Sequence, residues 1–343
     1  MIVLGIETSC DETSVAIVEK KKDQILGSLL NEQTLSQVLK HRPFGGVVPE
    51  LAFREHSNSL DYLVKKTLKK SNLNINEIDA FAATVGPGLI GGLLIGSNYS
   101  KALSLATQKP FFSINHLQAH TLVSRMNKKI DFPFLCLLVS GGHTQILVAE
   151  NYKKFTLLGE TLDDALGEAF DKTAKLLGLD YPGGPELEKL AMKSNGLKKY
   201  DLPLPLANKD DFNFSFSGLK TSIRRIVQND FKDCDKFDLA LSFHESVSKC
   251  LTIKVRKAIK FFKKKYNEGF FVITGGVASN KYIRKNLKTL CQQENIKFYV
   301  PAPRLCVDNA TMVAWSGIER FVNGDEGDSL SLRPKPRWNL EEL

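Results

Sequence analysis

Residues 134–158 read FLCLLVSGGHTQILVAENYKKFTLL, and residues 2–30 read IVLGIETSCDETSVAIVEKKKDQILGSLL. Both segments contain an apolar run, a short polar loop, a second apolar run, a lysine-rich turn and a third apolar run. This pattern predicts three strands joined by tight turns in each segment. The expected strands are at 2–6, 15–18 and 25–30 in the first copy and at 134–139, 145–149 and 155–158 in the second. The sequence therefore predicts a duplicated architecture.

A second element also occurs twice, as a strand that leads into a glycine turn and then a helix. Residues 81–85 lead into Gly86-Pro87-Gly88, and residues 270–274 lead into Gly275-Gly276. Glycine suits a backbone that turns sharply or lies against a phosphate. The repeats predict an α/β protein of two similar domains around a nucleotide cleft. We expect a first domain at 1–112 plus 305–330, a second at 113–304, and a basic tail at 331–343.

Composition places the chain among ordinary globular proteins. It has 343 residues, 43% of them hydrophobic and 25% charged, which excludes a disordered or collagen-like chain. Its 47 Lys and Arg exceed its 38 Asp and Glu, for a net charge of +9. This excess favours an anionic partner such as nucleic acid, a nucleotide or a membrane surface, although solvated lysine faces explain it equally well. Clusters of basic residues occur at 65–70, 263–265 and 333–338.

Two features indicate a cytoplasmic location. The six cysteines are scattered, without a CxxC pair, which suits reduced thiols: Cys10, Cys136, Cys234, Cys250, Cys291 and Cys306. The chain opens directly on an apolar strand and shows no targeting segment. The apolar stretches at 133–140 and 88–96 are far shorter than the roughly 20 residues of a membrane span, so we expect no membrane insertion.

A histidine pair is the first candidate for chemistry. His116 and His120 are four residues apart, which on a helix directs both imidazoles to one face, where they either bind one metal ion or form a simple surface pair. A zinc peptidase of the HExxH type is disfavoured, because Leu117 stands where the general base would be. Asp308 is a candidate third ligand, or else the N-cap of a helix that begins at Asn309.

Other acids are ambiguous. Asp171 lies in a helix expected at 160–177, where it either binds ribose hydroxyls or is a surface acid paired with neighbouring lysines. Glu188, four residues after Gly184, has the same two interpretations.

Phe214 and Phe216 alternate as in a strand that faces a core, and we favour this interpretation over a nucleic-acid surface.

Eight ordered motifs together carry a resemblance that covers nearly the whole chain: GIETSCDETSVAIV, GGVVPELAFREH, NHLQAH, LLVSGGHTQIL, GEAFDKTAKLLGLDYPGGP, FSFSGLKT, ITGGVASN and CVDNATMVAW. In these motifs the chain resembles the bacterial-type tRNA N6-adenosine threonylcarbamoyltransferases, formerly described as O-sialoglycoprotein endopeptidases. The resemblance implies the actin, sugar kinase and Hsp70-like fold, which agrees with the duplication above.

The resemblance also implies an activity and its site. The family transfers the threonylcarbamoyl group from threonylcarbamoyl-AMP to N6 of adenosine 37 in tRNAs that read codons beginning with adenine. His116, His120 and Asp308 would hold one divalent metal, either Fe²⁺, which is the usual assignment, or Zn²⁺. The adenylate would bind to Leu138, Val139, Ser140, Gly141, Gly142, Asp171, Gly184, Glu188 and Asn280. The implied partners are tRNA, a degenerate paralogue of the same fold, a small P-loop ATPase and a separate synthase that makes the adenylate.

Transfer to an amine also requires a proton acceptor. Asp11 and Glu12, in the loop after the first strand, are the acids that we would test as general bases, or they orient that loop.

Three alternatives of other classes are a metallopeptidase, a small-molecule kinase of the same fold and a non-enzymatic scaffold. The absence of the HExxH glutamate disfavours a metallopeptidase. A small-molecule kinase would not need the histidine pair, and the complete set of ligand residues disfavours a non-enzymatic scaffold. Binding to tRNA should weaken steeply as salt rises.

Overall fold

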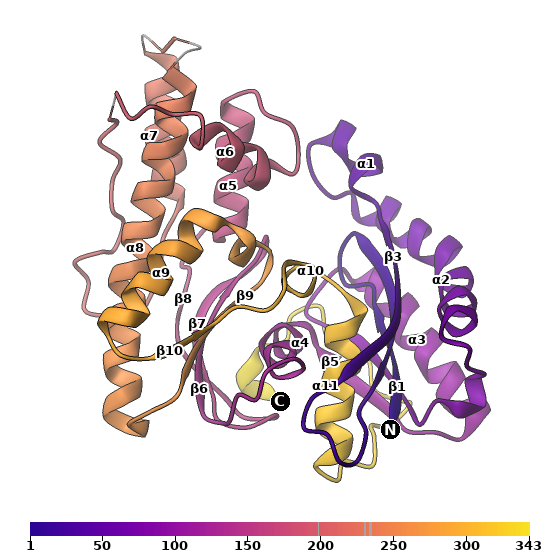
Figure 1. Ribbon diagram of the computed structural model, residues 1–343. Coiled ribbons are helices and arrows are strands. Elements are labelled where there is room, and N and C mark those ends of the chain that lie inside the picture. The colour runs from indigo at the N-terminus through magenta and orange to yellow at the C-terminus, as the bar shows by residue number, and fades with distance from the viewer. Residues whose placement is uncertain (198, 230, 233–234) are drawn as a thin grey trace. The chain divides into compact units, whose positions relative to one another are not determined.

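The computed structural model describes residues 1–197, 199–229, 231–232 and 235–343 (Figure 1). Contacts divide these residues into two compact units. Unit 1 consists of Met1–Ile130, Asn151–Phe155 and Val307–Leu343, and unit 2 consists of Asp131–Glu150 and Thr156–Cys306. Residues 113–130 and the tail 331–343 therefore lie in unit 1. The domain boundaries expected from the sequence stay a prediction, because contacts alone do not show which segments fold independently.

Unit 1 is built on a five-stranded sheet of order β3-β2-β1-β4-β5. Its strands are β1 (Ile2–Glu7), β2 (Glu12–Glu19), β3 (Ser28–Ser36), β4 (Ala80–Gly86) and β5 (Phe111–Asn115). β1 pairs antiparallel with β2 and parallel with β4, which in turn pairs parallel with β5. Because β1, β4 and β5 are parallel, their carboxyl ends meet at one edge of the sheet, where ligands bind in such folds.

Different helices cover the two faces of this sheet. The helices of unit 1 are α1 (Val38–His41), α2 (Pro49–Ser71), α3 (Ile90–Thr107), α4 (His116–Leu122) and α11 (Ala310–Val322), with the 3-10 turns η1 (Arg42–Phe44), η2 (Ile75–Glu77), η3 (Val123–Arg125) and η6 (Leu340–Glu342). Leu4 and Ile6 of β1 belong to one apolar cluster with Leu60 of α2. Gly5, whose missing side chain points the other way, lies against the backbone of α11.

Unit 2 repeats the plan with a sheet of order β10-β9-β6-β7-β8. Its strands are β6 (Phe134–Val139), β7 (Thr144–Ala149), β8 (Phe155–Glu160), β9 (Phe270–Thr274) and β10 (Lys297–Tyr299). β6 pairs antiparallel with β7 and parallel with β9, and β9 pairs parallel with β10. In both sheets the third, second, first, fourth and fifth strands are neighbours in that order, so the predicted duplication is confirmed.

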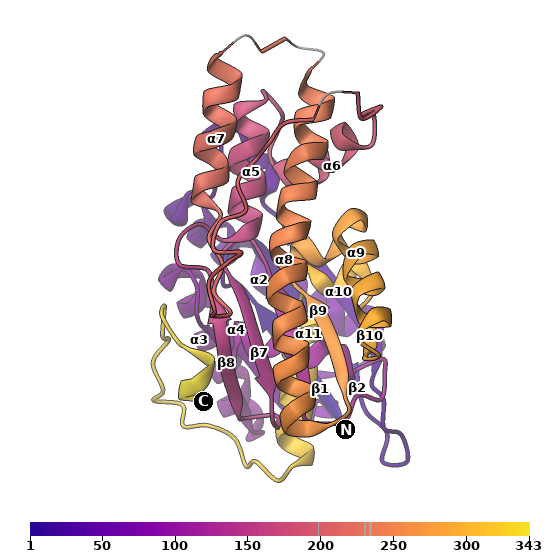
Figure 2. The same cartoon turned by 90° about the vertical axis from the view of Figure 1, so that its left-hand side faces the viewer.

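The helices of unit 2 are α5 (Leu166–Leu176), α6 (Gly183–Ala191), α7 (Ser217–Gln228), α8 (Lys236–Tyr266), α9 (Lys281–Gln293) and α10 (Pro303–Cys306), with the 3-10 turn η5 (Gly276–Ser279). α8 packs its apolar stripe, which includes Val247, Leu251 and Val255, into the same core as Leu135 and Leu137 of β6. Figure 2 shows that α9 runs beside α8.

Three local predictions were wrong. The third strand of the first copy covers 28–36 instead of 25–30, because Ile25 and Leu26 are exposed in a turn and the polar residues that follow form the strand. The helix expected at 160–177 begins at Leu166, after the end of β8. Phe214 and Phe216 are buried as expected, but residue 214 makes only an isolated bridge and α7 starts at Ser217.

Within the described ranges no disulfide bond forms at Cys10, Cys136, Cys250, Cys291 or Cys306, and Cys234 lies outside the described residues. Among the helices of those ranges, none has the length and apolar character that crossing a membrane requires.

Candidate metal centre and nucleotide loops

The histidine pair lies on α4, at the carboxyl end of β5. Asn115 ends that strand and caps the helix, since its Oδ1 accepts hydrogen bonds from the backbone N–H of Leu117 at 2.9 Å and of Gln118 at 3.3 Å. The cap starts the helix directly at His116. His116 and His120 therefore lie on one face, with ring centroids 4.7 Å apart, and both are buried.

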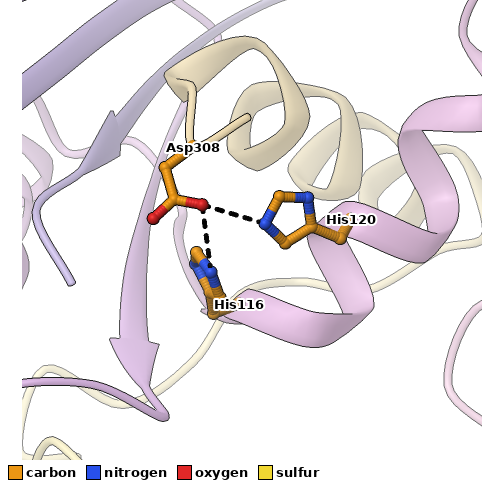
Figure 3. A group of neighbouring side chains, drawn as sticks. All are labelled: His116, His120 and Asp308. Carbon is orange, nitrogen blue, oxygen red and sulfur yellow. Dashed lines mark hydrogen bonds and ion pairs between the residues drawn. The ribbon is translucent and has the colours of Figure 1, made fainter. Parts of the chain in front are cut away.

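Asp308 joins the histidines from the loop that precedes α11. Its Oδ1 lies 3.4 Å from His116 Nε2 and 3.0 Å from His120 Nε2, and Figure 3 shows the three side chains pointing toward one another. The alternative interpretation of Asp308 as an N-cap is wrong. Asn309 takes that role, because its Oδ1 accepts a hydrogen bond from Met312 N–H at 2.8 Å. The carboxylate of Asp308 is thus directed at the imidazoles instead of the helix end.

The donor set of this group fits a divalent cation. It offers two imidazole nitrogens and one carboxylate oxygen, all within 4.8 Å of one another. Ligands bound at about 2.1 Å to one tetrahedral or octahedral ion lie roughly 3.0–3.5 Å apart, which is close to both distances from Asp308. Two histidines with one carboxylate are the ligands of many catalytic Fe²⁺ and Zn²⁺ sites that keep a position open for substrate.

Glu7, at the end of β1, lies behind the group and is missing from the sequence prediction. Its Oε2 lies 3.1 Å from His116 Nδ1 and accepts a hydrogen bond from Thr84 Oγ1 at 2.6 Å, while its Oε1 accepts one from Ser9 N–H at 2.6 Å. A carboxylate on one imidazole nitrogen fixes the ring and leaves the other nitrogen free for a metal. The signal in the sequence was a charged residue inside an apolar strand, which cannot be buried without partners.

The electrostatics of the group favour a cation. Burial opposes the charged form of His116, but the carboxylates of Asp308 and Glu7 outweigh it, so the pKa of His116 lies well above its usual value. Burial also opposes ionisation of Asp308, yet the two histidines hold its pKa far below the ordinary range. Burial lowers the pKa of His120, which stays neutral. The carboxylates of Glu7, which is buried, and Asp308, which is half-buried, lie on either side of the His116 proton, and a divalent cation can take the place of that proton.

We predict that Glu7→Gln lowers metal affinity by about 10- to 100-fold, the usual effect of losing the carboxylate behind a metal-bound histidine. The amide cannot accept hydrogen bonds from both Ser9 and His116. Competition with a fluorescent chelator measures the affinity. Thr84→Val is the matched control, because it removes a hydrogen bond to Glu7 but keeps the carboxylate at His116. Equal affinities for Glu7→Gln and the unmodified chain would remove the orienting role of Glu7.

Asp11 lies in the loop between β1 and β2, whereas Glu12, which was expected in the same loop, is the first residue of β2 and pairs with Ser36. Asp11 is buried, and its backbone carbonyl accepts a hydrogen bond from Gln37 N–H at 3.0 Å. Burial, together with the charges of Asp308 and Asp11, raises the pKa of Glu12 to about 10. Glu12 therefore holds its proton at neutral pH, and a bound cation that neutralises Asp308 would remove one of the charges responsible.

A buried histidine holds this loop in place, and sequence reasoning missed it. His56 of α2 contacts the Cys10 carbonyl through Nε2 at 3.0 Å and Thr13 Oγ1 through Nδ1 at 2.8 Å. Since a carbonyl only accepts, Nε2 carries the hydrogen and Nδ1 accepts from the threonine. Burial lowers the pKa of His56, which favours this neutral form. The motif GGVVPELAFREH thus supplies a residue that supports the loop of Asp11 and the start of β2 at Glu12.

The first glycine turn is filled by the chain itself. Lys335 N–H donates to the carbonyl of Val85 at 2.8 Å, and Gly88 N–H donates to that of Pro336 at 3.1 Å. A side chain on Gly86 would collide with the Lys335 carbonyl. The tail 331–343 therefore packs directly against the backbone of this glycine turn.

The second set of predicted residues lies in unit 2, around the carboxyl ends of β6 and β9. Leu138 and Val139 are fully buried, so only their backbone can serve a ligand. The loop that follows exposes Gly141 and Gly142, whose N–H groups have no acceptor in the described part of the chain. An added Cβ at either glycine would meet open space. This loop has the free donors that an anion requires.

Asp171 is paired with a helix N-terminus rather than with lysines. Its Oδ1 accepts a hydrogen bond from Gly183 N–H at 2.7 Å, at the start of α6. The neighbouring Lys172 instead pairs with Asp164 at 2.6 Å, so the interpretation of Asp171 as a lysine-paired surface acid is wrong. Burial raises the pKa of Asp171, while hydrogen bonds from Gly183 and Gly184 oppose the shift.

Glu188 and Asn280 complete the set and are joined by contacts. Glu188 Oε1 accepts a hydrogen bond from Lys281 N–H at 2.6 Å, next to Asn280. The Asn280 amide caps α9 through Ile283 N–H at 3.0 Å and donates to His244 Nε2 at 3.1 Å. His244, which sequence reasoning missed, donates its Nδ1–H to a backbone carbonyl, and burial lowers its pKa. A buried neutral histidine therefore fixes the orientation of the Asn280 amide.

Comparison with known proteins agrees with this architecture. The family model described as tRNA N6-adenosine threonylcarbamoyltransferase matches residues 28–315. Proteins of that name from Brucella anthropi and Brucella suis are each 47% identical over 347 aligned residues, which cover 100% of this chain and 96% of each relative.

Two solved structures share the fold at low identity. The activator of the 2-hydroxyisocaproyl-CoA dehydratase from Clostridium difficile is 16% identical with a TM-score of 0.52, covering 96% of this chain and 99% of that one. HypF from T. kodakarensis is 14% identical with a TM-score of 0.60, covering 94% and 48%. The predicted actin, sugar kinase and Hsp70-like fold is confirmed. The match to the family model and the identity over the full length show that this chain belongs to the tRNA N6-adenosine threonylcarbamoyltransferase family.

Proposed function

We propose that the chain transfers the threonylcarbamoyl group from threonylcarbamoyl-AMP to N6 of adenosine 37, in tRNAs that read codons beginning with adenine, and releases AMP. The full-length identity of 47% to relatives named for this transfer is the observation that carries the proposal. As a member of this family, the chain is a tRNA-modifying acyltransferase. The His116, His120 and Asp308 group with Glu7 behind it supports the assignment independently of identity.

We propose that the His116, His120 and Asp308 group holds one divalent metal, with Fe²⁺ as the first candidate and Zn²⁺ as the second. Both ions accept two imidazoles and a carboxylate, so the donor set supports either. When bound, the ion supplies a Lewis-acidic positive charge toward the substrate. Glu7 keeps His116 in the tautomer whose Nε2 faces Asp308, and Asp308 contributes negative charge to the site.

In the proposed reaction, the N6 amine of adenosine attacks the carbonyl carbon of the mixed carbamoyl-phosphate anhydride. A C–N bond forms, the C–O bond to phosphate breaks, and AMP leaves with the electron pair while N6 loses one proton. The N–H groups of Gly141 and Gly142 would donate hydrogen bonds to the phosphate oxygens as their charge rises.

The remaining unit 2 residues would hold the rest of the adenylate. Leu138 and Val139 would position the loop that starts at Ser140, since their side chains are buried. Asp171 and Glu188 would accept hydrogen bonds from ribose hydroxyls, beside Gly184 and Asn280. Contacts support this grouping, because Asp171 bonds to the helix of Gly184 and Glu188 bonds to the residue after Asn280.

We propose Asp11 and Glu12 as the acids that accept the amine proton. Two observations support this role: His56 holds the loop of Asp11 and the start of β2 at Glu12, and Asp308 is near enough for its charge to affect Glu12. Glu12 serves as a base only once its pKa falls from about 10, so a bound cation would be needed first. The proton goes from N6 to the carboxylate and then to solvent.

We predict that Gly142→Ala weakens AMP binding by about tenfold or more and leaves the melting temperature within about 2 °C. The methyl group meets no protein atom, so only a ligand lying against the loop is displaced. Calorimetric titration with AMP measures the affinity. Gly46→Ala, whose added methyl also meets open space, is the control. Unchanged AMP affinity in Gly142→Ala would place the phosphate elsewhere.

We also propose the partners and the location that the resemblance implies. The partners are tRNA, a degenerate paralogue that pairs with the first domain, a small P-loop ATPase and a separate threonylcarbamoyl-AMP synthase, and the location is the cytoplasm. The metallopeptidase and the small-molecule kinase are not favoured, because Leu117 replaces the peptidase base and a kinase has no use for the His116, His120 and Asp308 group.

The deciding experiment is mass spectrometry of adenosine 37 in tRNA after incubation with the chain, partner proteins from a bacterial relative and freshly made threonylcarbamoyl-AMP. We expect the threonylcarbamoyl modification, with AMP released in equal amount. An unmodified adenosine in the presence of fresh adenylate would overturn the proposed function. Glycoprotein cleavage or rapid ATP turnover by the chain alone would favour the two alternatives.

A further inference from the structure

The surplus positive charge of the chain lies in one segment. Residues 249–297 contain 13 Lys and Arg but only two acids, Glu268 and Glu294, for a net charge of +11. The whole chain carries +9, so everything outside this segment nets −2. The segment includes most of α8 and all of α9. A surplus confined to two helices is a local surface property instead of a uniform solubility effect.

The two helices run side by side in the same direction. At one end Asn280 Nδ2 lies 3.1 Å from His244 Nε2, and at the other Arg256 donates to Gln293 Oε1 at 2.9 Å. On α9 the buried positions include Ile283 and Leu287. Lys281, Lys285 and Lys288 recur at intervals of four and three residues, so they form a stripe on the opposite side of α9. All three are exposed.

Ten of the 13 basic residues of the segment, all on α8 or α9, fall into two groups by their partners. One group makes ion pairs within unit 2: Lys254 with Asp211, Lys257 with Asp210, Arg256 with Glu294 and Lys265 with Glu150. The other group is exposed and has no acidic partner among the described residues: Lys249, Lys260, Lys264, Lys281, Lys285 and Lys288. We call this second group the α8–α9 lysine face. Its charges are available to an external anion.

The lysine face begins at the proposed adenylate site. Lys281 directly follows Asn280, and its N–H donates to Glu188. From there α9 carries the face away over 13 residues, a length of about 20 Å. A polyanion that lies along this face therefore reaches the site at one end.

We propose that the α8–α9 lysine face binds the sugar-phosphate backbone of tRNA and guides the nucleotide toward the site in unit 2. The identity of the polyanion rests on the proposed function, because the reaction acts on tRNA. Flexible lysines without partners bind phosphates as point charges and release counterions, so they give affinity without reading sequence.

The test compares two variants of the full chain that each lose four positive charges. K260Q/K264Q/K285Q/K288Q removes part of the face, and K65Q/K66Q/K69Q/K70Q removes four lysines from α2 in unit 1. Filter binding to a tRNA transcript is measured between about 50 and 200 mM KCl. We expect the first variant to bind at least about tenfold more weakly and its plot of log affinity against log salt to be shallower by about 3. The α2 variant should change little.

An equal loss of tRNA affinity in both variants, or no loss of affinity in the first variant, would overturn the proposal. Sedimentation with phosphatidylserine-containing vesicles tests the alternative. If the α8–α9 lysine face is needed for binding to vesicles and not for binding to tRNA, it is a membrane-binding surface. The transfer assay separates this proposal from the proposed function. If the unmodified chain forms no product, that function fails, while the binding comparison still tests the face. If the unmodified chain does form product, the K260Q/K264Q/K285Q/K288Q variant should show a raised KM for tRNA with an unchanged kcat.

Discussion

Asp308→Ala is expected to purify without a bound transition metal and to transfer threonylcarbamoyl at least about 10³-fold more slowly, equivalent to about 4 kcal/mol. The substitution removes the only carboxylate that reaches both His116 and His120 in the described residues. Two imidazoles alone bind a divalent ion weakly, and Glu7, the carboxylate that remains at His116, contacts its Nδ1 on the side away from Asp308. Inductively coupled plasma mass spectrometry gives the metal content, and modified adenosine gives the rate.

Asp61→Ala is the control for this experiment, since Asp61 is an exposed acid of α2 paired with Lys65 at 2.7 Å. Its metal content and rate should equal those of the unmodified chain. A metal content in Asp308→Ala that matches the control would mean that the His116, His120 and Asp308 group is not the metal site.

Gly275→Ala has the second large expected effect, a loss of about 3 kcal/mol or more in the free energy of unfolding of unit 2. Gly275 has φ of 91° and ψ of 164°, a region that is essentially restricted to glycine. A methyl group there would also collide with the carbonyl of Val139, at the start of the 140–142 loop. The backbone must shift at that point, so AMP affinity should fall together with stability. Urea unfolding and titration with AMP measure the two effects.

The neighbouring Gly276→Ala serves as the matched control. It adds the same methyl group one residue further along, but no protein atom lies within 4 Å of the added Cβ. We expect its free energy of unfolding to lie within about 0.5 kcal/mol of that of the unmodified chain. Similar losses in both variants would show that the segment disfavours any side chain and that the contact with Val139 is not the cause.

The sequence predicted the parts of the fold that depend on local pattern. The duplicated strands and the helical spacing of His116 and His120 are visible because apolar periodicity and a four-residue interval are short-range signals. The third strand was misplaced because edge strands such as β3 bury little and carry polar residues. Asp308 remained ambiguous, since its closeness to His120, 188 residues away in sequence, appears only in the fold.

Glu7, His56 and His244 were beyond sequence reasoning for a different reason. Each acts through another residue: Glu7 through His116, His56 through Cys10 and His244 through Asn280. Such supporting contacts follow no fixed spacing, because they depend on which elements pack together. Trp338, in the basic stretch of the tail, is also buried in the core of unit 1, which its neighbours in the sequence do not indicate.

The discontinuity of unit 1 sets an order of events during synthesis. Its sheet uses the first 130 residues, but α11, Asp308 and the tail come from Val307–Leu343. At about 5–20 residues per second, the ribosome takes roughly 10–40 s to pass from His120 to Asp308. All strands of unit 2 emerge in that interval. The metal group therefore cannot form until Asp308 has been synthesised, which is after every strand of unit 2.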